Sequence, residues 1–271
     1  MKKTYLAGLV VIAIIALGIV VVPKTMAEKQ TKGNRSVKIE GATPENPVVS
    51  LGKAFDKKSG KMVDGYAIVH YAKNASKPAK PSSGTTCYGY IAKGAKWKGT
   101  PEPWFIDSYY NGDLGVDFVL PNMVSDITKW ESAAGAGIDI LGEGTSSAAP
   151  ITISNLLNDK NEVTFATINN AGVIAATYIW GYFSGPIFQR ELVEWDQVYN
   201  DKYQWTVDAK TEPTKMDFEN IATHELGHSV GMGDLYNSSC SEQTMYGYAN
   251  YGQTDKRDLN TGDITGIDLL Y

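Results

Sequence analysis

The stretch THELGHSVGMGD, Thr223 to Asp234, decides the fold of this 271-residue chain. It places His224 and His228 four residues apart, with Glu225 between them. On an α-helix, residues four apart lie on the same face, one turn from each other. Two imidazoles in that arrangement are a typical pair of metal ligands, and the glutamate beside them is well placed to act as a general base. The stretch therefore predicts a helix that carries a metal site.

The flanking residues indicate where this helix begins and ends. We expect Thr214 to be its N-cap, with Asp217 completing a capping box. Gly231, three residues after His228, is expected to end the helix in a left-handed conformation. That turn would bring Asp234 back towards the same metal as a third ligand. Apolar residues at three- and four-residue steps give the helix a face to bury: Phe218, Ile221, Ala222 and Leu226.

HELGHSVGMGD resembles the metzincin zinc-peptidase signature HExxHxxGxxH/D, and SEQTMYGY supplies a candidate methionine turn at Met245. The wider resemblance, from about Pro103 to Tyr271, is to matrixin-like secreted peptidases. DQVYNDKYQW (196–205) resembles the matrixin strand before the active-site helix, and TGDITGIDLLY (261–271) resembles the matrixin C-terminal helix. The sequence departs from the matrixins at Asp234, where they carry histidine and a minority of metzincins carry aspartate.

The resemblance implies a zinc-dependent endopeptidase. One catalytic Zn²⁺ would be held by His224, His228 and Asp234, and peptide bonds would be hydrolysed by a zinc-activated water with Glu225 as the general base. Met245 would form an apolar floor beneath the metal. The competing hypothesis from another class is an exported, non-enzymatic binding protein with a structural or degenerate zinc site. A structural site needs no general base, so the glutamate favours the enzyme.

The resemblance also bears on residues after the metal-binding stretch. Tyr248 stands two residues after Met245, where some metzincin families place a tyrosine that contacts zinc or stabilises an oxyanion. Matrixins lack that tyrosine, so Tyr248 is a candidate catalytic residue with a packing role as the alternative. Asp263 matches the acidic residue that opens the matrixin C-terminal helix and braces the methionine turn. Calcium is common in matrixins, but the sequence shows no loop with calcium-binding spacing.

The fold class expected is α/β (α+β) and metzincin-like. It would have a twisted, mostly parallel five-stranded sheet, two long helices, the zinc site on the active-site helix, and a C-terminal helix after the methionine turn. Helical spacing predicts a helix over 121–133. Residue type and alternation predict strands, some short, at 65–72, 87–92, 104–110, 138–141, 163–168, 173–183 and 191–200.

By the resemblance, Val173 to Phe183 would be an antiparallel edge strand above the active-site cleft. The edge of a sheet presents unpaired N–H and C=O groups, to which an extended peptide can add as a further strand. We therefore expect polypeptide substrates to bind along this strand.

The N-terminus predicts export. Lys2 and Lys3 precede an unbroken apolar run from Leu6 to Val22, and Ala27 is a possible cleavage point. Residues 1–27 are thus either a signal peptide or a signal anchor, since the run is near the minimum length for a membrane span. Only an uncleaved run would place the protein on a membrane. We expect a protein that is secreted, or anchored on the outer face of the cell membrane.

Charge divides the remaining chain near residue 100. Residues 28–100 contain 14 Lys and Arg against 5 Asp and Glu, whereas residues 101–271 contain 8 against 25. We interpret 28–100 as a basic N-terminal extension, pro-segment or small β-subdomain, and 101–271 as the catalytic domain. The contrast arises either from solvated faces or from a basic segment held across an acidic cleft. An acidic catalytic half argues against nucleic acid as a partner. His70 is interpreted as a structural histidine of a strand and not as a zinc ligand.

The chain has two cysteines, Cys87 and Cys240. An even pair in an oxidising compartment predicts a disulfide. The alternative is a Cys87 thiolate that covers the metal in a latent form, but no matrixin-style cysteine-switch sequence surrounds it.

Overall fold

The computed structural model describes residues 35–73, 86–112, 114–153 and 157–271. The expected signal peptide or anchor at 1–27 lies outside the described residues. Arg35–Tyr271 forms one compact unit. The part of the chain described includes no helix long and apolar enough to cross a membrane.

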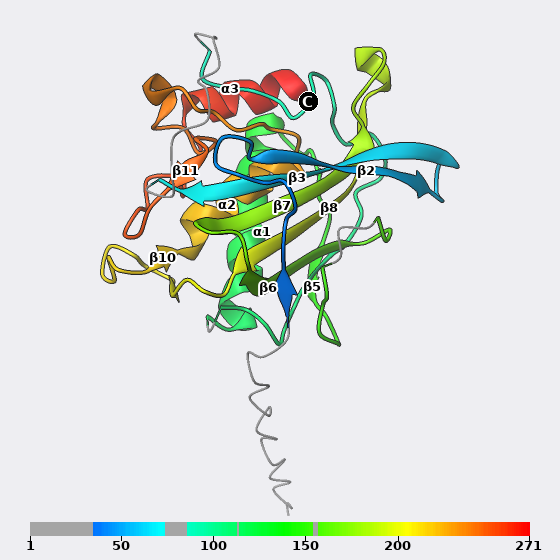
Figure 1. Ribbon diagram of the computed structural model, residues 1–271. Coiled ribbons are helices and arrows are strands. Elements are labelled where there is room, and N and C mark those ends of the chain that lie inside the picture. The colour runs from blue at the N-terminus through cyan, green and yellow to red at the C-terminus, as the bar shows by residue number, and fades with distance from the viewer. Residues whose placement is uncertain (1–34, 74–85, 113, 154–156) are drawn as a thin grey trace, which may run out of the picture. The chain divides into compact units, whose positions relative to one another are not determined.

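A nine-stranded sheet forms the centre of this unit, with the order β11-β3-β7-β8-β6-β4-β5, while β1 pairs with β6 and β2 with β3 (Figure 1). Strands β5, β4, β6 and β8 are parallel, whereas β7 is antiparallel to β8. The strands are β1 (Ser36–Val37), β2 (Val48–Asp56), β3 (Lys61–Ala72), β4 (Trp104–Ile106), β5 (Gly144–Ser146), β6 (Asn161–Ile168), β7 (Val173–Tyr182), β8 (Glu191–Asn200) and β11 (Tyr248–Ala249). The mixed α/β class with a mainly parallel central sheet is confirmed.

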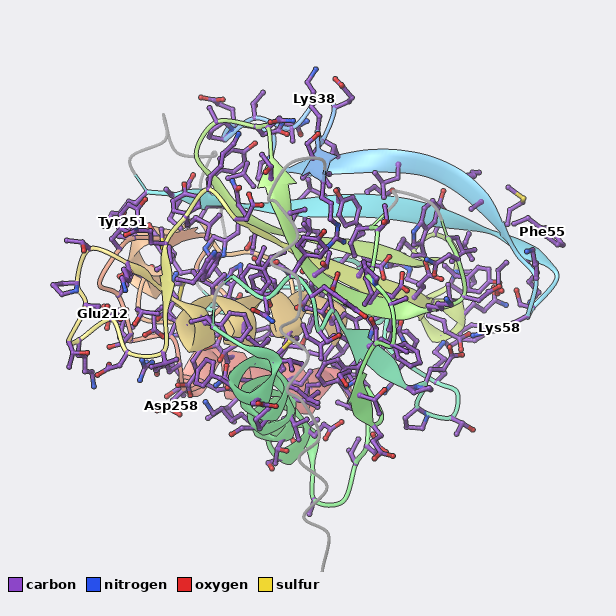
Figure 2. The ribbon with its side chains drawn as sticks, turned by 90° about the horizontal axis from the view of Figure 1, so that it is seen from below. Lys38, Phe55, Lys58, Glu212, Tyr251 and Asp258 are labelled. Carbon is purple, nitrogen blue, oxygen red and sulfur yellow. A yellow bond between two sulfur atoms is a disulfide. The ribbon has the colours of Figure 1, made fainter. Side chains whose placement is uncertain are left out.

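Three helices cover one face of the sheet, as Figures 1 and 2 show from two directions. They are α1 (Val116–Ala134), α2 (Phe218–Ser229) and α3 (Thr261–Leu270). The main apolar core fills the space between sheet and helices, and a second core lies elsewhere against the sheet. A two-stranded sheet, β9 (Trp205–Thr206) with β10 (Met216–Asp217), leads into α2. Two 3-10 turns complete the elements, η1 (Ile187–Gln189) and η2 (Ser238–Cys240).

Helix α2 begins later than the sequence predicted. Asp217 is its N-cap, and the carboxylate accepts a hydrogen bond from the backbone N–H of Asn220 at 3.0 Å. The expected cap, Thr214, precedes β10. A short aspartate directly before the apolar residues satisfies an orphan amide of the first turn, so the helix needs no extension towards Thr214.

Two expected strands are absent from their positions in the described chain. Residues 138–141 are not a strand because the backbone N–H groups of Ile140 and Leu141 donate to Glu131 of α1, at 2.7 and 3.2 Å. The strand follows instead as β5. Residues 87–92 contribute one isolated bridge, between Tyr90 and Met232.

The largest difference concerns β7, which was expected to be an edge strand of a five-stranded sheet. It pairs with β8 on one side and with β3 on the other, antiparallel to both. Strands β2 and β3, from residues 48–72, therefore extend the sheet beyond β7. Segments from both sides of residue 100 lie in one compact unit.

The sequence GYAIVHYA explains why β3 is held there. Side chains alternate between the two faces of a strand. Ala67, Val69 and Tyr71 are buried in the second core, whereas Ile68 belongs to the core beneath the helices. A strand with apolar residues on both faces is suited to the interior of a sheet.

The structure contains a disulfide between Cys87 and Cys240, 153 residues apart in sequence. It ties the segment before β4 to η2, in the loop that follows α2. Cys240 is buried. The bridge closes a long loop, which removes conformational freedom from the unfolded chain.

We expect the paired change Cys87→Ala with Cys240→Ala to lower the free energy of unfolding by about 4 to 5 kcal/mol, because the loop it closes is long. Urea unfolding of the oxidised parent and the variant measures the difference. The parent under reducing agent is the control and should approach the variant. Equal unfolding midpoints for the oxidised parent and the variant would contradict the stabilising role.

Candidate metal centre

Helix α2 and the turn after it bring three metal-ligating side chains together. His224 and His228 lie one helical turn apart on α2. Gly231, at a φ of 103°, follows the helix and turns the chain back. The turn places Asp234 Oδ1 at 3.2 Å from Nε2 of His224 and 3.4 Å from Nε2 of His228.

Each histidine is oriented by a hydrogen bond from its other ring nitrogen. His224 Nδ1 donates to the carbonyl oxygen of Thr244 at 2.8 Å, and His228 Nδ1 donates to that of Met232 at 2.9 Å. A carbonyl oxygen only accepts, so both Nδ1 atoms carry the proton. When the rings are neutral, each Nε2 then presents a lone pair, as metal-ligating histidines require.

The third side chain is oriented in the same way. The Tyr236 hydroxyl donates to Asp234 Oδ2 at 2.8 Å. Oδ1 of Asp234 and Nε2 of both His224 and His228 are buried without a hydrogen-bond partner among the described residues. Unpaired buried polar atoms are costly. Separations of 3.2 and 3.4 Å match the spacing of about 3.3 to 3.5 Å between ligands of a tetrahedral zinc ion. The three residues fit zinc.

Charge in the cluster favours a cation. Burial opposes an imidazolium at His228, but the Asp234 carboxylate outweighs burial and raises the pKa of His228 to about 9. Burial lowers the pKa of His224 to about 4. One buried carboxylate thus compensates one positive charge, which a metal ion would replace with release of a proton.

Glu225 lies beside this cluster with both carboxylate oxygens engaged. Oε2 accepts from the Thr177 hydroxyl of β7 at 2.6 Å, and Oε1 lies 3.2 Å from Nδ1 of His70 of β3. The His70 ring also packs on His224, with 3.9 Å between ring centroids. Burial raises the pKa of Glu225 above its usual value, which favours its proton-accepting role.

The loop after α2 supports the cluster from below. Met245 is fully buried against Gly227, where an added Cβ would lie 2.2 Å from the methionine sulfur. Asp263, at the start of α3, accepts from the backbone N–H of Thr244 at 2.7 Å and of Met245 at 3.1 Å. Since the Thr244 carbonyl orients His224, Asp263 connects α3 to the metal-ligating face.

Tyr248 lies in β11, buried, with its ring 5.4 Å from that of Tyr236. The Nζ group of Lys256 donates to the carbonyl oxygens of Tyr246 and Tyr248. Burial lowers the pKa of Lys256 to about 8. These bonds hold residues 246–248 beside Tyr236, whose hydroxyl orients Asp234.

The cluster is closed to solvent. His224 and Glu225 are 0% exposed, His228 is 1% exposed, and the Asp234 side chain is 4% exposed.

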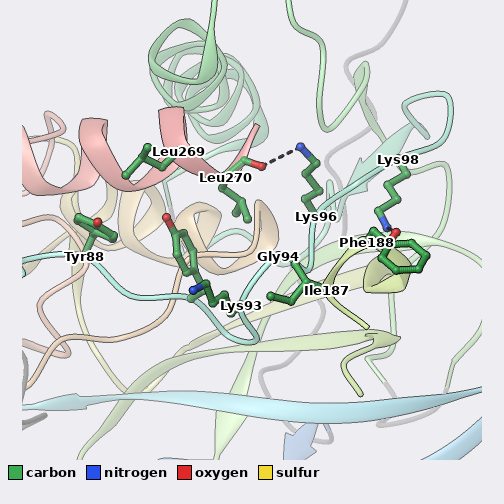
Figure 3. A pocket seen from close by; sticks show the side chains of 10 residues that line it. Tyr88, Lys93, Gly94, Lys96, Lys98, Ile187, Phe188, Leu269 and Leu270 are labelled. Atoms are coloured by element: carbon green, nitrogen blue, oxygen red, sulfur yellow. Dashed lines mark hydrogen bonds between the residues drawn. The ribbon is translucent and has the colours of Figure 1, made fainter. Parts of the chain in front are cut away.

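A surface pocket of about 720 Å³ lies elsewhere and shares no residue with the cluster (Figure 3). Its lining is Tyr88, Tyr90, Lys93, Gly94, Lys96, Lys98, Ile187, Phe188, Leu269 and Leu270.

Sequence reasoning did not assign His70, Thr177 or Tyr236 to the site. His70 had one signal, since it is one of only three histidines in the chain. Thr177 and Tyr236 had none, because a hydroxyl that orients a carboxylate leaves no local pattern.

The sequence model of the Matrixin family matches residues 146–271. Stromelysin-1 of Equus caballus is 29% identical over 177 residues, which is 65% of this chain and 33% of that protein. Stromelysin-1 of Mus musculus is 28% identical over 60% of this chain and 30% of its own length. Metalloendoproteinase 2-MMP of Arabidopsis thaliana is 41% identical over 56 residues, 21% of this chain and 14% of the relative. The chain thus spans about a third of the stromelysins it matches.

Proposed function

Because residues 146–271 are a matrixin-like metzincin domain, we propose that this protein is a zinc-dependent endopeptidase that hydrolyses peptide bonds. The observation that carries the proposal is the set of buried, unpaired ligand atoms on His224, His228 and Asp234, next to the carboxylate of Glu225. A zinc ion held there supplies a Lewis acid that polarises a carbonyl group and acidifies water.

The chain's own residues have distinct roles in this proposal. Glu225 accepts a proton from water and returns it to the leaving amine, and Thr177 fixes the carboxylate through Oε2. Met245 packs beneath α2 against Gly227, and Asp263 fixes Met245 by accepting a hydrogen bond from its backbone N–H. Tyr248, whose ring lies 5.4 Å from that of Tyr236, stays a candidate catalytic residue, with a packing role as the alternative.

The proposed substrates are polypeptides, bound in extended form beside β7. An added strand would use backbone groups, so few side-chain contacts are needed. The apolar run at 6–22 supports export, and secretion or outer-face anchoring is proposed on that basis. The remaining domain assignment is also a proposal, with 28–100 as an extension, pro-segment or small β-subdomain and 101–271 as the catalytic domain.

The non-enzymatic alternative is not favoured. Burying a carboxylate is costly unless it is paired. Glu225 lies outside the group formed by His224, His228 and Asp234, and forms a second candidate group with His70 and His224. A purely structural zinc site gives no reason to keep that carboxylate inside.

Metal removal tests the function. We expect about one zinc per purified chain, and cleavage of an unfolded protein such as casein that stops with a chelator and returns with added Zn²⁺. Elemental analysis and gel-based cleavage measure the two. Full zinc occupancy without cleavage would contradict the function, if the parent chain and its His70→Ala and Gly65→Val variants are all inactive.

A further inference from the structure

We propose that β3 is an internal occupant of the peptide-docking position beside β7, so that this structure is the closed form of the protein. The proposal rests on the proposed function, because it concerns the position a substrate would take. The occupant is a named segment of the chain, residues 61–72.

The backbone pairing of β3 is that of an added strand. Residues Asp64 to Tyr71 pair antiparallel with β7. At its far end β3 pairs parallel with β11, which follows the methionine turn. The backbone N–H of Ala72 donates to Gly172 O at 2.8 Å and that of Lys73 to Ala249 O at 3.0 Å. The slot between β7 and the segment after Met245 is therefore filled with strand, which leaves no free docking edge there.

The side chains of β3 close the site as well. His70 enters from β3 and contacts the base Glu225 and the ligand His224. Nε2 of His70 is itself buried without a hydrogen-bond partner in the described chain. A substrate carbonyl must approach the water that this base deprotonates, and in this structure the His70 imidazole lies against the base. The near-zero exposure of the cluster is the direct result.

Strand β3 belongs to the β2–β3 hairpin, which can separate from α2 and the turn that carries Asp234. Strand β2 pairs with β3 and with no other strand in the described residues. The hairpin's outer end carries Phe55 and Met62, 56% and 52% exposed, and Figure 2 shows Phe55 and Lys58 away from the helices. The ligands come from α2 and the turn after it, and the parallel strands β5, β4, β6 and β8 do not pair with the hairpin. Opening of such a unit is a local transition.

Apolar burial and backbone pairing hold β3 beside β7. At the outer end of the hairpin, Lys58 pairs with Glu102 at 2.5 Å and the Tyr182 hydroxyl of β7 donates to Asp56 at 3.4 Å. Ala67, Val69 and Tyr71 are buried in the second core. Weakening the packing and pairing of β3 raises the fraction of molecules in which β3 has left β7. The apparent affinity for an added ligand rises in proportion to that fraction.

Two variants weaken the attachment of β3 at different points. A Cβ at Gly65 would lie 2.5 Å from the ring of Trp180 in β7, so Gly65→Val pushes the strands apart. His70→Ala removes the side chain that contacts Glu225. Met62→Ala is the matched control, because Met62 pairs with Phe55 of β2 before the pairing with β7 begins.

The first readout is binding of a tripeptide hydroxamate, measured by calorimetry on zinc-loaded full-length chain in a Glu225→Gln background. The second is hydrolysis of a quenched peptide by the same variants with Glu225 intact. We expect Gly65→Val and His70→Ala to raise both by at least about 10-fold, and Met62→Ala to change neither.

The outcomes separate the two proposals. A gain in hydroxamate binding without any hydrolysis supports the occupant and contradicts the peptidase. Hydrolysis that is equal or lower in both variants overturns the occupant and leaves the peptidase standing. Loss of cooperative melting in both variants also overturns it, because a strand that leaves its site cannot be required for the fold.

Discussion

Replacing Glu225 with glutamine is expected to leave zinc bound and to lower the rate of peptide hydrolysis by about 100- to 10,000-fold, the usual contribution of general acid–base catalysis. Glutamine has nearly the same shape, and its amide can keep one of the contacts to Thr177 and His70. It cannot accept and return a proton near neutral pH. The variant should therefore separate proton transfer from metal binding, which His224, His228 and Asp234 provide.

The measurement is kcat/KM on a quenched peptide, with zinc content and melting temperature determined on the same samples. Glu219→Gln is a matched control on the same helix, since Glu219 pairs with Lys129 and Arg257 on the surface side. The prediction fails if Glu225→Gln retains the parental rate with zinc content unchanged. Loss of zinc would instead assign Glu225 a structural part in the centre.

The site could be predicted from sequence because its geometry is local. His224, Glu225 and His228 need only helical periodicity, and Gly231 needs only its positive φ. Asp234 follows from the direction of that turn. Strands β6, β7 and β8 could also be predicted, since they are long and rich in β-branched and aromatic residues.

The partners of β7 could not be predicted in the same way. Strand pairing between residues 64–71 and 173–181 joins segments more than a hundred residues apart, and nothing in either segment specifies the other. The family resemblance began near residue 103, so it gave β7 a free edge. His70 was interpreted as a residue of a strand, and it lies in β3. The error at β7 arose because the resemblance did not cover the strand that fills the edge.

The charge contrast left two interpretations open. The basic segment either has solvated faces, or it is held electrostatically against the acidic half, in which case salt would weaken the docking. The docked strand β3 instead buries Ala67, Val69 and Tyr71 in an apolar core. Arg35 does form a 2.8 Å ion pair with buried Asp107, but it lies before β1 and away from the strand that pairs with β7. The closed form should therefore persist at high salt.

Replacing Asp234 with alanine is expected to lower zinc affinity by more than about 100-fold and to abolish hydrolysis. Loss of a residue that only orients a ligand costs about 10- to 100-fold, and loss of the ligand itself should exceed this. Alanine leaves His224 and His228 facing a buried space with no anionic partner. Competition against a zinc chelator of known affinity gives the constant for parent and variant.

Tyr236→Phe provides the graded comparison. It removes the hydroxyl that donates to Asp234 Oδ2 at 2.8 Å and leaves all three ligand atoms in place. Its zinc affinity should fall by about 10- to 100-fold, between the parent and Asp234→Ala. If Asp234→Ala binds zinc as tightly as Tyr236→Phe and remains active, the carboxylate is not a ligand. The third position would then belong to another group, and His70, whose buried Nε2 has no hydrogen-bond partner in the described chain, would be the first residue to change.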